Sequence, residues 1–324
     1  MITIAELQNI VEKALQKENF VTEPQGLYQP IEYVMSLGGK RIRPTMCLAG
    51  FFLFNDDFEK ALPAGLGLEI FHNFTLLHDD VMDNADVRRN QPTVHKKWDE
   101  NTAILSGDAM LIKAYQYVCK TDTSVLKPLL DLFSITALEV CEGQQYDMEF
   151  ETRNDVSADE YLNMIRLKTA VLLAGSLKAG AIVANANAED AENLYQFGEN
   201  IGLAFQLQDD FLDVYGDEKT FGKAIGGDIV ANKKTFLLIN ALQKASGSLR
   251  DELQNWINVE TFDREQKINA VRNIYNQLGI DKIAKDKMHE YFQVALKSLE
   301  KVNGKESMKS ELRDFAVKLI ERSR

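Results

Sequence analysis

The chain has 324 residues, of which 45% are apolar and 27% charged, and 49 Asp and Glu outnumber 37 Lys and Arg to give a formal net charge of −12. This acidic balance repels phosphate backbones and disfavours a nucleic-acid-binding role, and no apolar run approaches the roughly 20 residues of a membrane-spanning helix. With three scattered cysteines and no basic-then-apolar leader, the sequence predicts a cytoplasmic globular protein without a disulfide framework.

Helices dominate the predicted elements. Apolar residues recur at helical spacing, as in Ile268, Val271, Ile274 and Leu278. All six prolines lie at or before Pro128, and proline breaks helices. In chain order we predict helices over residues 3–18, 27–37, 44–54, 60–86, 100–119, 124–150, 157–184, 188–215, 233–246, 264–279, 281–302 and 306–322.

The chain carries no internal linker rich in Gly and Ser or in Pro. We therefore predict a single all-α domain covering residues 1–324, built as one large helical bundle. Asn303-Gly304 lies between two charged helical stretches and is typical of a turn between helices.

The acidic pattern Asp-Asp-x-x-Asp occurs twice, 130 residues apart, each time at the end of an apolar helical run. The first aspartate cluster is Asp79, Asp80 and Asp83, and the second is Asp209, Asp210 and Asp213. Carboxylates at positions i and i+4 share a helix face and repel, and the dipole at a helix C-terminus disfavours anions. A simple solvated helix end could explain one such cluster, but two favour Mg²⁺, which takes oxygen ligands and shares its sites with substrate phosphates.

Cations accompany both clusters. The segment Gly38 to Pro44 reads Gly-Gly-Lys-Arg-Ile-Arg-Pro, and its glycines let the backbone approach an anion. Arg88 and Arg89 follow the first cluster, while Lys223, Lys233 and Lys234 follow the second. Arg binds phosphate oxygens in a fork and Lys acts as a point charge, so the pattern predicts a polyanion held between metal ions and basic side chains.

In this order the motifs resemble those of the trans-prenyl diphosphate synthases, the family that includes farnesyl and geranylgeranyl diphosphate synthases. The resemblance covers most of the chain, from Gly38 to Lys234. Besides the basic segment, it rests on Leu76 to Asp83, Arg88-Arg89, Pro92-Thr93, His95, Gly143-Gln144, Lys168-Thr169, Phe205 to Asp213, Gly222-Lys223, Gly226-x-Asp228 and Lys233-x-Thr235.

The resemblance implies an all-α isoprenoid-synthase fold in which both clusters face a central cavity. It also implies a homodimer that joins isopentenyl diphosphate head-to-tail to an allylic diphosphate of C5 to C15, with three Mg²⁺ ions bound beside the allylic diphosphate. By matching position, the metal ligands are Asp79, Asp83 and Asp209, supported by Asp80, Asp210 and Asp213.

The same resemblance implies roles for further side chains. Arg88, Lys168, Lys223 and Lys233 would hold the allylic diphosphate, with Thr169 and Gln206 near its reacting carbon. The diphosphate of isopentenyl diphosphate would be held by Gly39, Lys40, Arg43, His72 and Arg89. A core position for His72 and an ordinary surface position for Lys168 are the alternatives from the residues alone.

Product length is expected to depend on the helix that leads to the first cluster. Phe74 precedes Asp79 by five residues, about 7.5 Å of helical rise, and Phe71 lies one turn further. In the resembling family a bulky aromatic at the position of Phe74 accompanies short products, and Thr75 is too small to block the chain. We expect a C15 to C20 product, with C20 preferred; the alternative is that Phe71 and Phe74 are ordinary core residues.

Other functions remain open at this point. A di-iron carboxylate protein would need two Glu-x-x-His motifs, and only Glu69-Ile70-Phe71-His72 fits. A terpene cyclase or head-to-head condensing enzyme on the same fold would lack the basic segment at Gly38 to Pro44, and a non-catalytic subunit would not need both aspartate clusters.

Overall fold

The structure is a computed structural model that describes residues 2–217 and 225–320. It contains two compact units. Unit 1 comprises residues 1–135, 175–195 and 302–312, and unit 2 comprises residues 136–174, 196–301 and 313–324. The expectation of a single domain over residues 1–324 stays a prediction.

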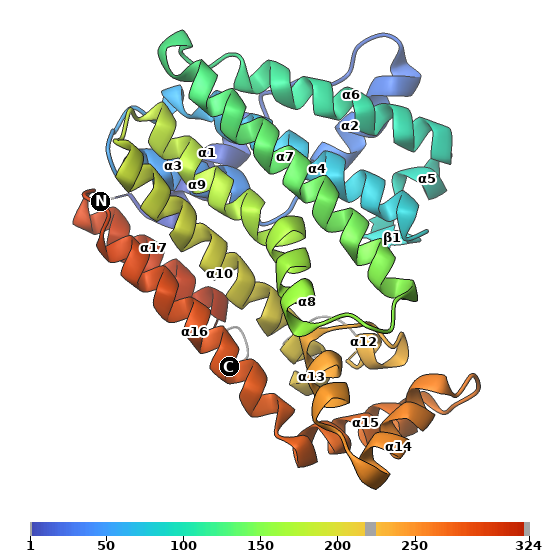
Figure 1. The fold of residues 1–324 in the computed structure, drawn as a ribbon. Helices are drawn as coiled ribbons and strands as arrows, with labels where there is room; N and C mark the ends of the chain where they lie inside the picture. The colour runs from blue at the N-terminus through green and yellow to red at the C-terminus, as the bar shows by residue number, and fades with distance from the viewer. Residues whose placement is uncertain (1, 218–224, 321–324) are drawn as a thin grey trace. The chain divides into compact units, whose positions relative to one another are not determined.

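Unit 1 is helical apart from one small hairpin (Figure 1). Its own elements are α1 (Ile4–Leu15), α2 (Gln25–Ser36), α3 (Ile42–Phe52), the 3₁₀ turn Phe58–Lys60, α4 (Leu62–Met82), β1 (Val87–Arg88), β2 (Gln91–Pro92), α5 (Val94–Lys97) and α6 (Glu100–Val118). Four long helices contribute residues to both units: α7 (Thr123–Thr152), α9 (Val171–Val183), α10 (Ala188–Tyr215) and α17 (Glu306–Ile320).

In the described residues of unit 2, all the regular elements are helices. Its own elements are α8 (Ala158–Ile165), the π-helical turn Arg166–Ala170, α12 (Gly227–Val230), α13 (Phe236–Lys244), α14 (Gly247–Asn258), α15 (Arg264–Leu278) and α16 (Ile280–Glu300). The all-α prediction is confirmed, and the turn at Asn303-Gly304 does separate α16 from α17.

Local signals explain where several helices begin. Thr3 and Ser157 each form a capping box with the glutamate three residues later, so both N-caps satisfy otherwise unpaired backbone N–H groups. Asp99 caps α6 in a simpler way, by accepting from the backbone N–H of Thr102. At the other end of α15, Gly279 has φ +66°, a left-handed conformation that glycine adopts without a Cβ penalty.

Two predicted helices differ from those observed. The segment predicted as 60–86 ends at Met82, because Asn84, Arg89 and Asn90 all have positive φ and the chain folds into the β1–β2 hairpin. The segment predicted as 157–184 is interrupted by the π-helical turn at Arg166–Ala170.

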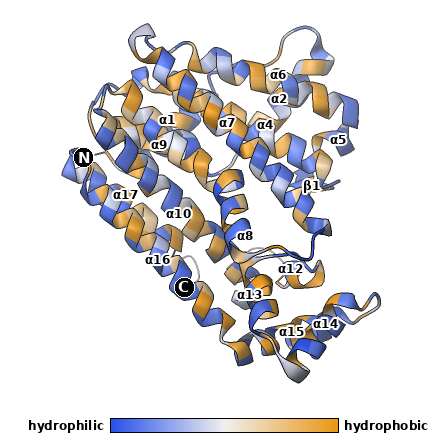
Figure 2. Ribbon diagram, in the orientation of Figure 1, coloured by the Kyte–Doolittle hydropathy of each residue, from blue (hydrophilic) through white to orange (hydrophobic). Residues whose placement is uncertain are grey.

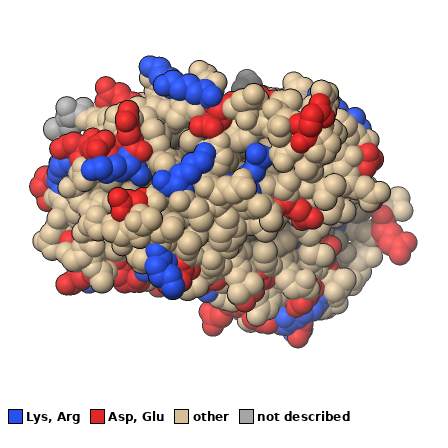
Figure 3. Space-filling model, turned by 90° about the horizontal axis from the view of Figure 1, so that it is seen from above, with Lys and Arg blue, Asp and Glu red and all other residues tan. Residues whose placement is uncertain are grey.

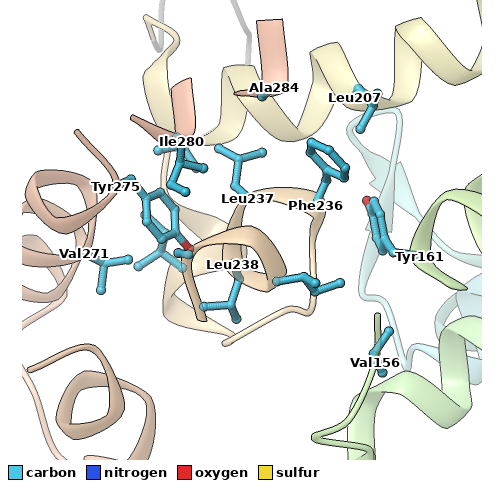
Figure 4. Packing of buried hydrophobic residues seen from close by; sticks show 14 of the residues in the cluster. Val156, Tyr161, Leu207, Phe236, Leu237, Leu238, Val271, Tyr275, Ile280 and Ala284 are labelled. Atoms are coloured by element: carbon cyan, nitrogen blue, oxygen red, sulfur yellow. The ribbon is translucent and has the colours of Figure 1, made fainter. Parts of the chain in front are cut away.

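Small residues allow close helix packing in unit 1. A Cβ placed on Gly180 of α9 would lie 1.9 Å from the carbonyl oxygen of Cys47 on α3, and one on Gly50 would lie 2.2 Å from that of Leu177. No larger residue fits where these two helices cross. Unit 2 has its own apolar core, in which α8, α10, α13, α15 and α16 all take part (Figure 4).

Apolar and polar residues alternate along most of the helices, as expected for helices with one buried face (Figure 2). On the face seen in Figure 3, acidic and basic side chains are interspersed among uncharged ones. Among the described helices, none is both long and apolar enough to cross a membrane.

Candidate functional site

The first aspartate cluster lies where α4 ends. Asp79 and Asp80 belong to its last turn, and Asp83 is the C-cap residue, whose backbone N–H donates to the carbonyl oxygen of Asp79 at 2.8 Å. Asp80 is 5% exposed, Asp79 is half-buried and Asp83 is exposed. Three residues of one motif therefore present three different environments.

Arg88 on β1 binds the buried member of this cluster. Its Nε donates to Asp80 Oδ1 at 2.7 Å, and its Nη2 lies 3.5 Å from Asp79 Oδ2. Burial raises the pKa of the Asp80 carboxyl, and the Arg88 guanidinium opposes that rise. The pair fixes both the last turn of α4 and the direction of β1.

A two-residue turn places Arg89 next to the basic segment. Arg89 (φ +53°) and Asn90 (φ +61°) connect β1 to β2 in the left-handed conformation of a type I′ hairpin. Arg89 Nη1 donates to the carbonyl oxygen of Gly38. Gly39 has φ +145°, and a Cβ there would lie 3.0 Å from Arg89 Cζ, so a glycine is needed both for the backbone and for the space.

Further bonds hold this hairpin in place. Tyr33 of α2 donates from its hydroxyl to the carbonyl oxygen of Pro92 at 2.8 Å, and Thr93 Oγ1 donates to that of Ala85 at 2.7 Å. Lys96 Nζ donates to Asn84 Oδ1 at 2.9 Å. The hairpin that carries Arg88 and Arg89 is thus fixed from both of its ends.

Arg41 differs from the other cations of the basic segment because its guanidinium is fully engaged inside the protein. It is 4% exposed and donates to Glu69 Oε1 at 2.7 Å, to the carbonyl oxygen of Met35 at 2.8 Å and to Glu12 Oε2 at 3.2 Å. Removing one partner of such a buried pair leaves an uncompensated charge. Arg41 therefore anchors the segment.

Lys40 and Arg43 are arranged differently. Lys40 is exposed and its backbone carbonyl accepts from Gln8 Nε2 at 2.9 Å. Arg43 is half-buried, and among the described residues no hydrogen-bond acceptor meets its buried Nε. Burial lowers the pKa of the Arg43 guanidinium, Glu69 opposes that effect, and Arg89 adds to it. Arg43 thus retains donor capacity inside a positive environment.

His72 lies among the arginines of unit 1. Its pKa falls well below the usual value, first because of burial and then because Arg43, Arg89, Arg88 and Arg41 repel a second positive charge. His72 is consequently neutral at pH 7. Glu69, three residues earlier, bonds to Arg41 and to Asn73 Nδ2, so the Glu-x-x-His pattern here gives an ion pair rather than a di-iron half-site.

Aromatic side chains follow the same helix away from the aspartates. Phe71 is 1% exposed and contacts Phe133 of α7 edge-to-face at 5.4 Å between ring centroids. Phe74 is 8% exposed and lies 5.6 Å from Phe71 and 4.8 Å from the ring of His78. The hydroxyl of Thr75 donates to the carbonyl oxygen of His72 at 2.8 Å.

The second aspartate cluster lies at the C-terminal end of α10. Asp210 is 5% exposed, accepts from the Tyr161 hydroxyl through Oδ2, and accepts from Gln206 Nε2 at 3.3 Å through Oδ1. Burial raises the pKa of Asp210 to about 7, although both of these hydrogen bonds oppose the rise. Asp209 is half-buried on the adjacent position of the helix.

Asp213 holds the segment that follows α10. Its Oδ1 accepts from the backbone N–H of Gly227 at 3.2 Å and its Oδ2 from that of Asp228 at 3.0 Å. The backbone N–H of Gly226 donates to the carbonyl oxygen of Asp213 at 2.7 Å. Asp213 therefore caps the start of α12.

The π-helical turn places Lys168 and Thr169 near this cluster. Lys168 Nζ donates to Asp147 Oδ2 of α7 at 2.6 Å, and Thr169 Oγ1 donates to Gln206 Oε1 at 3.4 Å. A Cβ on Gly143 of α7 would lie 2.2 Å from the backbone nitrogen of Lys168, so α7 can approach the turn only because residue 143 is a glycine.

Lys233 follows α12, and its charge acts on Asp210 to lower the pKa of that carboxyl. The neighbouring Lys234 points elsewhere, since its Nζ donates to the carbonyl oxygen of Glu151 at 2.8 Å. Lys223 and Gly222 lie outside the described residues.

The predicted residues thus form one group in each unit. Unit 1 brings together the first aspartate cluster with Gly39, Arg43, His72, Arg88 and Arg89, and unit 2 brings together the second cluster with Lys168, Thr169, Gln206 and Lys233. In the part of the chain that the structure describes, no three His, Cys, Asp or Glu side chains form a metal-binding group by themselves.

Sequence reasoning missed several contributors. Glu69 and Asp147 were not recognised as the partners of Arg41 and Lys168. For Tyr161 the sequence offers one indication of a role at the site. It lies seven residues before Lys168, and helical spacing would place the two on one face. The contact of Asp147 with Lys168 has no signal in the sequence, since the two residues are 21 positions apart and lie on different elements.

Comparison with known proteins gives a consistent picture. The model of the family described as "Polyprenyl synthetase" matches residues 24–277. A geranylgeranyl diphosphate synthase of Methanosarcina mazei is 42% identical over 236 residues, which cover 72% of this chain and 73% of that protein.

Solved structures agree in fold. A crystal structure of a geranylgeranyl pyrophosphate synthase superposes with a TM-score of 0.94 at 44% identity and covers 100% of both chains. The geranylgeranyl pyrophosphate synthase of Corynebacterium glutamicum, complexed with isoprenyl diphosphate and magnesium, has a TM-score of 0.85 at 26% identity and covers 99% of this chain and 100% of its own.

Proposed function

The chain belongs to the polyprenyl synthetase family, and from this premise we propose that it condenses isopentenyl diphosphate head-to-tail with an allylic diphosphate of C5 to C15. The products are a longer prenyl diphosphate and pyrophosphate. Two relatives support this assignment: the 42% identical protein of Methanosarcina mazei is a geranylgeranyl diphosphate synthase, and the Corynebacterium glutamicum geranylgeranyl pyrophosphate synthase is complexed with isoprenyl diphosphate and magnesium.

The observation that carries the proposal is the positive group around His72 in a chain of net charge −12. Arg43, Arg88 and Arg89 all repel positive charge at this imidazole, and Arg43 Nε lies buried without an acceptor among the described residues. A buried, unpaired guanidinium nitrogen is costly unless a ligand supplies an acceptor. A diphosphate supplies several acceptor oxygens and negative charge at once.

We assign the diphosphate of isopentenyl diphosphate to Gly39, Lys40, Arg43, His72 and Arg89. Because His72 is neutral at pH 7, it would contribute a hydrogen bond rather than a charge. Gly39 would let the diphosphate approach the backbone closely. Arg88 would hold the allylic diphosphate through the part of its guanidinium that faces away from Asp80.

The donor set at the end of α4 fits Mg²⁺. Asp79 and Asp83 offer hard oxygen ligands, and the dipole at the C-terminus of α4 adds partial negative charge that a cation offsets. Mg²⁺ takes only one or two protein carboxylates and fills its remaining positions with water and phosphate oxygens. We propose Asp79, Asp83 and Asp209 as its ligands, with Asp80, Asp210 and Asp213 in support, and three ions per site.

When bound, Mg²⁺ would neutralise the charge that develops on the departing pyrophosphate. The chain's own cations, Arg88, Lys168, Lys233 and Lys223, would act on the same leaving group. Thr169 and Gln206 would lie beside the reacting allylic carbon. A dry site then lets the alkene of isopentenyl diphosphate capture the carbocation before water does, and the released pyrophosphate takes the proton that is finally lost.

We further propose a homodimer. Helix α6 exposes Ile104, Leu105 and Ile112 at 45%, 60% and 62%, and α7 exposes Ile135 at 60%. The two helices are neighbours, since Tyr115 of α6 donates to Ser134 of α7 at 3.1 Å. Exposed apolar patches of this kind are typical of protein–protein contacts.

The function is tested by incubating the purified protein with labelled isopentenyl diphosphate and each allylic primer in Mg²⁺, followed by chromatography of the products. We expect incorporation that stops when divalent metal is chelated. Incorporation that survives chelation would contradict the mechanism, and absence of incorporation with every primer would contradict the function.

A matched pair of variants tests the anion site. Arg43→Ala should raise KM for isopentenyl diphosphate by about tenfold or more, the loss of a hydrogen bond to a charged group. Arg153→Ala, which removes a half-buried arginine paired with Asp155 and Glu160, should leave KM unchanged. Equal KM values for the two variants would remove Arg43 from the site.

Product length is proposed to depend on Phe74. Its ring is nearly buried between Phe71 and His78, so its removal opens space along α4 below the aspartates. We expect a C15 to C20 product from the parent, C20 preferred, and a longer product from Phe74→Ala. Chromatography of the dephosphorylated alcohols checks this, and a Phe74→Ala product no longer than the parent's would contradict it.

A further inference from the structure

The buried member of the second aspartate cluster, Asp210, is joined to the π-helical turn by one line of hydrogen bonds. The Tyr161 hydroxyl donates to Asp210 Oδ2, Gln206 Nε2 donates to Asp210 Oδ1 at 3.3 Å, and Thr169 Oγ1 donates to Gln206 Oε1 at 3.4 Å. Three elements contribute to this line: α8, α10 and the π-helical turn.

Asp210 is in no position to act as an ordinary surface carboxylate. It is 5% exposed, and each of its oxygens accepts from a protein donor. Tyr161 is 2% exposed and belongs to the apolar core of unit 2, where its hydroxyl oxygen points toward the helix that carries Leu207 (Figure 4). The aromatic ring is thus held by packing while its one polar atom meets Asp210.

Fixing Asp210 also fixes the orientation of Gln206. Both Asp210 oxygens accept, Oδ2 from the Tyr161 hydroxyl and Oδ1 from the NH₂ group of Gln206, so the amide nitrogen is the end of the Gln206 side chain that faces Asp210. The amide oxygen then faces Thr169, whose hydroxyl proton is directed to it. If Asp210 were free to rotate, neither the amide of Gln206 nor the hydroxyl of Thr169 would have a defined direction.

We propose that Tyr161 is a positioning residue that acts through Asp210 to orient Gln206 and Thr169. This inference rests on the proposed function, in which Gln206 and Thr169 lie beside the reacting allylic carbon. Tyr161 itself lies two links away from these groups and contacts no substrate.

The test compares Tyr161→Phe with Tyr275→Phe. Tyr275 is also 2% exposed in the same core cluster, and its ring lies on the far side of Leu237 from Tyr161 in Figure 4, so it is a control for the loss of one buried hydroxyl. We expect Tyr161→Phe to lower kcat by about tenfold. KM for isopentenyl diphosphate should stay unchanged, because we assign the binding of that substrate to side chains of unit 1. Tyr275→Phe should leave kcat near the parent value.

A double-mutant cycle separates positioning from general destabilisation. In an Asp210→Asn background, Tyr161→Phe should cause little further loss of kcat, because the link it acts through is already altered. Multiplicative losses in the double variant would overturn the proposal, as would equal kcat values for Tyr161→Phe and Tyr275→Phe. Gln206→Glu, which cannot donate to Asp210, provides a second variant at the other end of the line if Tyr161→Phe does not fold.

A spectroscopic readout keeps this test independent of catalysis. The hydroxyl proton of a buried tyrosine bound to a carboxylate gives a downfield proton resonance, which should be lost in Tyr161→Phe and retained in Tyr275→Phe. If the parent condenses no substrate but shows this resonance, the proposed function fails while the hydrogen bond stands. If the parent is active but the resonance is absent, the positioning proposal fails.

Discussion

The aspartates of each Asp-Asp-x-x-Asp motif have the same chemistry but differ in burial and in hydrogen-bond partner. Each Asp-Asp-x-x-Asp motif contains one aspartate that is nearly excluded from solvent, and a guanidinium or a phenol meets it there. Asp80 and Asp210 each follow the first aspartate of their cluster by one position, about 100° round the helix, and the family resemblance implies a supporting role for both. The sequence could not predict their partners, because Arg88 and Tyr161 reach them from other elements.

The neutral state of His72 predicts a pH dependence of stability. Because its pKa in the folded protein is well below the value of 6.5 for an unperturbed histidine, the unfolded chain binds more protons between those two values. Stability is then fully present above pH 6.5 and is lost as the pH falls below it, by at most about 1.4 kcal/mol per pH unit.

Urea unfolding between pH 5 and pH 8 measures this effect. As the pH falls, the free energy of unfolding of the parent should decrease more than that of His72→Gln. The variant should therefore become more stable relative to the parent at low pH. His289→Gln, which replaces an exposed histidine of α16, is the control and should follow the parent. A His72→Gln curve parallel to that of the parent would contradict the lowered pKa of this half-buried histidine.

Among the elements, α10 was predictable from the sequence and the π-helical turn was not. Helix α10 spans Ala188–Tyr215, the predicted range, because its apolar pattern continues without interruption. The turn at Arg166–Ala170 lies within a segment predicted as one helix. The backbone of this turn packs closely against Gly143 of α7, and a local sequence pattern carries no information about such a distant contact.

Gly143 therefore offers a test of the element. In Gly143→Ala the new Cβ would lie 2.2 Å from the nitrogen of Lys168 and 2.7 Å from the carbonyl carbon of Leu167, so α7 and the turn must separate. We expect a loss of about 1–3 kcal/mol in the free energy of unfolding, as for other overpacked sites, together with a lower kcat.

The control for this change is Gly26→Ala on α2. Nothing lies within 4 Å of a Cβ at position 26, and Ala is the better helix former by about 0.5–1 kcal/mol. The midpoint of thermal unfolding should thus fall for Gly143→Ala and rise for Gly26→Ala. A Gly143→Ala protein as stable as the parent would show that the turn does not depend on this close approach.

At the scale of the whole molecule, the all-α class was predictable from composition and periodicity, and the family from the order of its motifs. That the two aspartate clusters face a common cavity stays a prediction, because each cluster belongs to a different unit. The same holds for the homodimer, which the sequence implied only through resemblance.

The dimer proposal predicts a defined assembly. Sedimentation should give about twice the chain mass of 36.6 kDa for the parent. A variant with Leu105→Lys and Ile112→Lys should dissociate, because two charges would lie in the apolar patch of α6. Val294→Lys, at an apolar position of α16 that is 42% exposed, should remain dimeric. A monomeric parent would contradict the proposal.

The buried position of Arg41 has a consequence for how an anion is attracted to the basic segment. Three cations stand at positions 40, 41 and 43, but the one in the middle is already neutralised by Glu69 and Glu12. An incoming anion therefore experiences two positive charges from this loop rather than three. Added salt should weaken binding of the anion less steeply than it would if all three cations were available.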